Sequence, residues 1–124
     1  MNTNKTGTGT AGTLTLNGNV SVDGGGNVDF TAANKVSLAT GSITIDSDGA
    51  TDANAGSILF GTSTVDGARA LTLDASANGT NRNGGAVSLG VTGGTTRLTS
   101  LTVNTAPSGS GTGGTLTLNG NIST

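Results

Sequence analysis

The sequence lacks cysteine, histidine, tryptophan, tyrosine and glutamate, and its 124 residues include one proline and two phenylalanines. Without histidine and cysteine, the usual ligands of zinc, copper and haem are missing, as are the imidazole bases of most hydrolases. No arrangement of the remaining polar residues matches a catalytic constellation. We therefore expect no enzymatic activity and no cofactor.

Long apolar runs and clusters of charge are missing too. No stretch approaches the roughly 18 apolar residues of a membrane span. Five basic residues are scattered against seven aspartates, for a net charge of −2, with no basic stripe that could bind nucleic acid. The density of Gly, Thr, Ser and Asn leaves no apolar stripe of helical period. We expect no membrane insertion, no nucleic-acid partner and no helical domain.

What is present is a repeat. Residues 2–22 recur at 104–124, shifted by 102 positions without a gap, and 14 of the 21 aligned residues are identical. A chain that begins to copy itself is typical of tandem arrays, in which each repeat packs on its neighbours. We interpret 1–124 as a single segment that contains one repeat (2–103) and the start of the next (104–124).

A shorter period lies within the repeat, marked by two apolar residues that flank another residue. Such alternation predicts a strand with one face inward. Successive members begin at positions 14, 36, 58, 87 and 116. We expect one ladder of inward residues, formed by Leu14 and Leu16, Val36 and Leu38, Ile58 and Phe60, Val87 and Leu89, and Leu116 and Leu118.

Two further sets of strands accompany this ladder. The second ladder comprises Ile43–Asp46, Leu71–Asp74 and Leu101–Asn104, which recur at a similar interval, and we also assign Val28–Phe30 to it. The third set is weaker and consists of Val20–Val22, Thr64–Val65 and Ile122–Ser123.

Strands that return at this interval predict a solenoid. Leu, Ile, Val and Phe together make up only about a fifth of the chain, which suits the narrow apolar column of a β-helix. Gly, Asn and Asp supply the turns. The predicted fold is all-β: a right-handed parallel β-helix (β-solenoid) with coils of about 22–30 residues and four coils per 102-residue repeat.

Three carboxylates, Asp46, Asp48 and Asp52, lie within seven residues around Gly49. Oxygen ligands at alternate positions are what calcium prefers. The segment lacks the spacing of an EF-hand loop, and the corresponding loops do not keep the acids. A solvated turn is the favoured interpretation, and calcium binding by these three residues is the alternative.

Threonine recurs at outward positions, as in Thr15, Thr44, Thr72, Thr102 and Thr117. Threonine suits an exposed strand in any case. A binding face for ice or glycans needs the same residue on rung after rung, and the outward residue of the first ladder varies. Binding through a Thr/Asn-rich lateral face is therefore the alternative function.

Two long phrases resemble a known family. Residues 56–74 contain GSILFG and TVDGARALTLD, and residues 84–103 continue with GGAVSLG and GGTTRLTSLTV. From about residue 12 to 122 the chain resembles the repeats of filamentous-haemagglutinin-like giant bacterial adhesins. The resemblance implies a parallel β-helix that is exported and displayed as a rod on the bacterial cell surface.

The ends of such a solenoid carry unpaired strand edges and an open apolar column. Leu14 and Leu16 begin the first ladder, and Leu116 and Leu118 end it, so we expect these residues to meet when copies stack end to end. The predicted function is a structural segment of an extracellular fibre or adhesin stalk, with further copies of itself as partners. Surface glycans are the partners of the alternative function.

Overall fold

The computed structural model describes residues 11–48 and 52–124, which form eleven short strands and no helix. Every pairing between these strands is parallel. Parallel pairing without helical crossovers needs a chain that winds round and returns one strand spacing higher on each coil. The predicted all-β parallel solenoid is confirmed.

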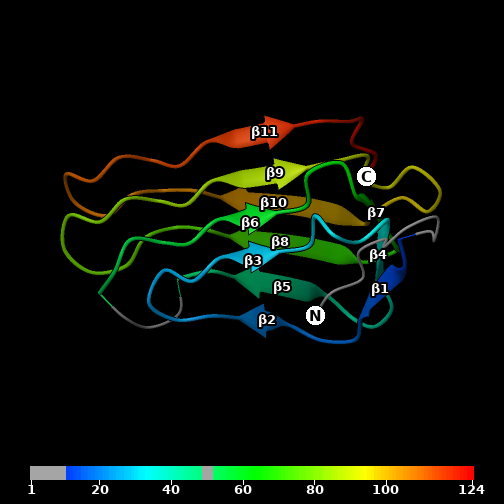
Figure 1. Ribbon diagram of the computed structural model, residues 1–124, viewed down its shortest axis with the longest axis horizontal. Helices are drawn as coiled ribbons and strands as arrows, with labels where there is room; N and C mark the ends of the chain where they lie inside the picture. The colour runs from blue at the N-terminus through cyan, green and yellow to red at the C-terminus, as the bar shows by residue number, and fades with distance from the viewer. Residues whose placement is uncertain (1–10, 49–51) are drawn as a thin grey trace.

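The strands form three sheets, and the chain visits them in turn (Figure 1). The first sheet contains β1 (Thr13–Leu16), β4 (Lys35–Leu38) and β7 (Thr64–Asp66). The second contains β2 (Val20–Ser21), β5 (Ile43–Asp46), β8 (Ala70–Asp74) and β10 (Ser100–Asn104). The third contains β3 (Val28–Asp29), β6 (Ile58–Leu59), β9 (Val87–Leu89) and β11 (Leu116–Leu118).

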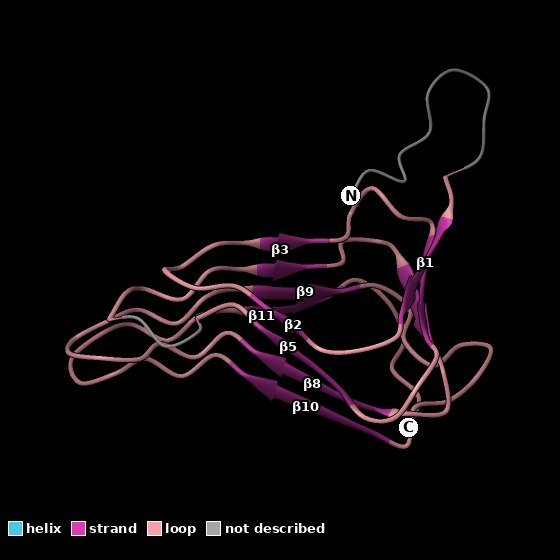
Figure 2. Cartoon of the chain, turned by 90° about the horizontal axis from the view of Figure 1, so that it is seen from below, coloured by secondary structure: helices cyan, strands magenta, loops and turns pink. Residues whose placement is uncertain are grey.

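Seen roughly along the stack, the three sheets enclose a wedge (Figure 2). The second and third sheets converge on an apex of long loops, and the first sheet closes the opposite side. Isolated bridges from Val65 to Thr92 and from Thr92 to Ile122 continue the first sheet beyond β7. The long loops that connect the second sheet to the third therefore lie along the apex of the wedge, at one edge of the molecule.

Alternate side chains fill the column inside the wedge. In β5 and β8 the inward residues Ile43, Ile45, Leu71 and Leu73 are at most 1% exposed. The rings of Phe30 and Phe60 stack in the same column, with their centroids 4.9 Å apart. Two inward residues per strand are enough to close so narrow a core, which explains how few large apolar residues the chain needs.

The prediction that five strands share the first ladder is wrong. Leu14 pairs with Val36 in the first sheet, but Ile58 pairs with Val28 and Val87 in the third sheet. The pairs 58/60, 87/89 and 116/118 accordingly lie on a different side of the solenoid from 14/16 and 36/38. The reason is the long loop before β6. The stretch from Val36 to Ile58 covers two sides of the coil, whereas the equally long stretch from Leu14 to Val36 covers all three.

The second ladder is confirmed in register, since Ile43 pairs with Leu71 and Leu71 with Leu101. Its proposed member Val28 belongs instead to the third sheet. The third set also divides: Val20 pairs with Ile45 in the second sheet, while Ile122 is bridged to Thr92 on the first. Short strands with the same alternation of apolar residues do not show from sequence alone which side of the solenoid they occupy.

The 102-residue repeat does not return the chain to the same side of the solenoid. Leu14 lies in the first sheet, but Leu116, its counterpart one repeat later, lies in the third. Val20 and its counterpart Ile122 are shifted by one side in the same sense. From Leu14 to Leu116 the chain makes three coils and two further sides. The repeat thus ends one side short of the four coils predicted from the sequence.

Candidate functional site

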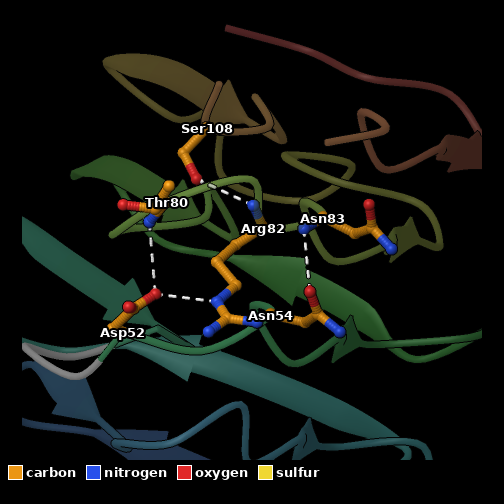
Figure 3. Close-up of polar contacts among 6 residues, drawn as sticks. All are labelled: Asp52, Asn54, Thr80, Arg82, Asn83 and Ser108. Atoms are coloured by element: carbon orange, nitrogen blue, oxygen red, sulfur yellow. Dashed lines mark hydrogen bonds and ion pairs between the residues drawn. The ribbon is translucent and has the colours of Figure 1, made fainter. Parts of the chain in front are cut away.

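The loop edge of the wedge is held together by side-chain oxygens. The Oδ1 atom of Asn27 accepts a hydrogen bond from the N–H of Ser57 at 2.7 Å. One coil later Asn54 accepts from the N–H of Asn83 at 2.9 Å (Figure 3). Asn83 in turn accepts from the N–H of Thr112 at 2.8 Å. Each asparagine thus satisfies a backbone donor of the following coil, where the loop is too irregular for strand pairing.

Asp52 and Arg82 join this edge as an ion pair between successive coils. Arg82 Nε donates to Asp52 Oδ1 at 2.7 Å, and the N–H of Thr80 donates to the same oxygen (Figure 3). The hydrogen bond from the Arg82 side chain and, to a smaller extent, the one from the Thr80 N–H lower the pKa of Asp52. The N–H of Arg82 in turn donates to Ser108 Oγ. These polar groups connect three coils to one another.

The three candidate calcium ligands do not form a metal site in the described part of the chain. Asp52 faces Arg82, and Asp46 Oδ1 accepts the N–H of Asp48 at 3.0 Å. Asp48 is 4% exposed; its burial, and then the nearby charge of Asp46, raise its pKa. No group of three acidic, histidine or cysteine side chains within residues 11–48 and 52–124 is placed to hold a metal ion. Gly49, within this turn, lies outside the described residues.

A second ion pair, which the sequence patterns did not suggest, joins β4 to β7. Lys35 Nζ lies 2.9 Å from Asp66 Oδ2, and Asp66 Oδ1 accepts the N–H groups of Thr95 and Thr96. Burial of this carboxyl opposes its ionisation, but the bonds from Lys35, Thr95 and Thr96 outweigh it and lower the pKa of Asp66 from 3.8 to about 2. Lys35 and Asp66 lie roughly one coil length apart in the sequence, and this spacing is the signal from which the ion pair could have been inferred.

The outward threonines align on one sheet only. Thr44, Thr72 and Thr102 are register partners along the second sheet. On the third sheet the outward positions are instead Asp29, Leu59, Ser88 and Thr117. A lateral face with a constant outward residue therefore spans three rungs of one sheet.

The apolar column is exposed at the C-terminal end of the stack, whereas at the opposite end Leu16, Val28 and Phe30 are at most 9% exposed. At the C-terminal end Leu116 and Leu118 of β11 are 47% and 54% exposed. At the opposite end lies an open concavity of about 440 Å³, whose walls include Leu14, Leu16, Val20, Val22, Val28 and Phe30. The four residues predicted to mediate stacking thus lie at the two ends, with Leu14 and Leu16 on a different sheet from Leu116 and Leu118.

Searches of protein-family models, of curated proteins and of solved structures each found no match to the chain. Within the described residues, no helix is long and apolar enough to cross a membrane.

Proposed function

We propose that this chain is a structural segment of an extracellular fibre or adhesin stalk of a bacterial surface. The observation that carries the proposal is the C-terminal end of the stack, where the column of apolar side chains and the edge of β11 stop at the exposed Leu116 and Leu118 rather than at a polar cap within the described residues. The resemblance to giant bacterial adhesins supports the extracellular location.

The polar groups support the same function. Asn54, Asn83 and the pair formed by Asp52 and Arg82 are engaged in holding one coil against the next. Hydrogen bonds directed along the axis suit a molecule that transmits tension or keeps a fixed length. The role is that of a spacer that extends by coils of about 4.8 Å each.

Electron microscopy of the purified chain at high concentration tests the proposal. We expect filaments one solenoid wide, in which each copy advances the axis by about 18 Å, because a repeat of just under four coils rises about 4.8 Å per coil. Small-angle scattering that shows a single compact copy at every concentration, together with an absence of filaments in the images, would contradict it.

The aligned threonines favour one second candidate, a lateral binding face for glycans. Thr44, Thr72 and Thr102 present a row of hydroxyl groups on the second sheet. A glycan array tests this candidate. Binding that is lost in the triple variant T44V/T72V/T102V but kept in T15V/T117V would favour the lateral face over the spacer.

A further inference from the structure

The same ten-residue segment occurs at both ends of the stack. Residues 12–21 and 114–123 differ only at Val20, which Ile122 replaces, so nine of the ten residues are identical. The two copies use opposite edges. Residues 13–16 pair with β4 in the coil above, whereas residues 116–118 pair with β9 in the coil below.

The N-terminal copy is bound to the next coil through groups that the C-terminal copy also has. The N–H of Asn34 donates to the carbonyl of Gly12, and the N–H of Ala39 donates to that of Leu16. The Thr40 hydroxyl donates to the carbonyl of Asn17, and the N–H of Thr44 donates to Asn19 Oδ1. The corresponding acceptors in the second copy are Gly114, Leu118, Asn119 and Asn121.

The C-terminal copy makes the complementary half of these contacts. The N–H of Val87 donates to the carbonyl of Thr115, the N–H of Asn119 donates to that of Leu89, and the N–H of Thr92 donates to that of Asn121. Among the described strands β11 is the outermost of its sheet and pairs with β9 alone. The backbone edge of β11 that faces away from β9 has no partner among the described strands, and the side chains of Leu116 and Leu118 are exposed.

We propose that residues 114–123 of one copy replace residues 12–21 of the next copy on β4 and β5, so that copies join by strand exchange. The inference rests on the proposed fibre function and specifies its junction. Leu116 then lies between Val87 of its own copy and Val36 of the next, because Leu14 pairs with Val36 in the single chain. Ile122 likewise takes the place of Val20 opposite Ile45.

The exchange also accounts for the repeat that closes one side short of four coils. Placing β4 of the next copy on β11 rotates that copy by one side of the wedge, since β4 belongs to the first sheet and β11 to the third. Val28 of the next copy then stands over β10 of the second sheet. Every side continues with a strand, as it would in a covalent tandem array.

The contact is head-to-tail and does not close, so it propagates as a filament. The displaced segment competes from within its own chain, where its effective concentration is high. We therefore expect exchange to be slow and to depend on protein concentration, and simple end-on docking without displacement is the competing geometry. In that geometry β11 meets β3 of the next copy, because both end the third sheet.

Cysteine pairs distinguish the two geometries, since the chain has no cysteine of its own. Strand exchange places Thr117 beside Ser37 of the next copy, as Thr15 lies beside Ser37 in the single chain. End-on docking places Thr117 beside Asp29 of the next copy. Neighbouring positions on adjacent parallel strands, about 5 Å apart, are within reach of a disulfide.

The experiment compares full-length T117C/S37C with full-length T117C/D29C at high concentration under mild oxidation. All three positions face outward, so both variants should fold, which circular dichroism checks. We expect a ladder of disulfide-linked oligomers for T117C/S37C, formed at least tenfold faster than any for T117C/D29C. Equal rates, or a faster ladder for T117C/D29C, would overturn strand exchange.

Electron microscopy of the unmodified chain under the same conditions separates the two proposals. Filaments without the T117C/S37C ladder would leave the fibre function in place and refute the exchange. Neither filaments nor a ladder would refute both.

Discussion

At the scale of single residues, the side-chain oxygens of Asn and Asp hold one coil against the next. Asn27, Asn54 and Asn83 each accept a backbone N–H from the following coil. Asp66 does the same for Thr95 and Thr96 while it also pairs with Lys35. A hydrogen bond to a charged acceptor contributes more than one to an amide, so Asp66 is the strongest of these connections.

The substitution Asp66→Asn should change the pH dependence of stability. The folded-state pKa of Asp66, about 2, lies below the ordinary value of 3.8. The group therefore stabilises the fold fully above pH 4, and this contribution is lost as the pH falls through about 2. The difference corresponds to roughly 2 kcal/mol. Urea unfolding at pH 5, 3 and 2 should show the gap between wild type and D66N closing as the pH falls.

The matched control is Asp52→Asn, which removes an ion pair at the loop edge whose side chains are 56% and 40% exposed. Solvent weakens such a pair, so its pH-dependent difference should be smaller. A D66N variant that loses stability between pH 5 and 2 as steeply as wild type does would contradict the role assigned to the carboxylate.

At the scale of elements, the spacing of the coils depends on a row of glycines at the entrance to the third sheet. A Cβ atom added to Gly56 would overlap the carbonyl oxygen of Gly26, one on Gly85 would overlap that of Gly56, and one on Gly114 would overlap that of Gly85. The backbones therefore approach more closely here than any residue with a side chain would permit.

Gly85→Ala should destabilise the fold by about 3 kcal/mol, because the atom to be displaced belongs to backbone and not to a flexible side chain. Gly18→Ala is the control, since nothing lies within 4 Å of a Cβ at that position. It should change the free energy of unfolding by less than about 0.5 kcal/mol. Chemical unfolding of the two variants provides the comparison, and equal effects would contradict the glycine row.

At the scale of the whole molecule, stability should vary along the stack. Leu71 is fully buried between Ile43 and Leu101, whereas Leu101 ends the same column and is partly exposed. Leu71→Ala should cost about 3 kcal/mol and Leu101→Ala clearly less in dilute solution. Equilibrium unfolding at low protein concentration measures both costs. A Leu101→Ala cost equal to that of Leu71→Ala would contradict an open column end.

Assembly should depend on the end leucines and not on the lateral faces. Leu118→Arg places a charge in the column where the next copy would pack, so filaments should be lost at concentrations at which wild type forms them. Thr117→Arg places the same charge on the outward face of the same strand and should leave filaments intact. Light scattering and electron microscopy of the two variants test this. Filaments of L118R would refute assembly through the C-terminal end.

Most of the architecture was predictable because its signals are local. Alternation in segments such as Ile43–Asp46 identifies strands, and three members of the second ladder follow from near-constant spacing, so these agree with the structure. The assignment of Val28–Phe30 to the same ladder was wrong. The Asn and Asp bonds between coils were not predictable. Each joins two positions roughly one coil apart in the sequence, and only the register of the coils shows which donor meets which acceptor.

The sequence by itself determined that this protein is a solenoid: the 102-residue repeat, the short apolar alternations and the scarcity of large side chains leave few other folds. Only the tertiary structure decided which side of the coil each strand occupies. Leu14 and Leu116 stand in identical local sequences, yet they lie on different sheets. The reason is that alternation depends on neighbouring residues, whereas the side of the solenoid depends on how much of each coil the preceding loops take up.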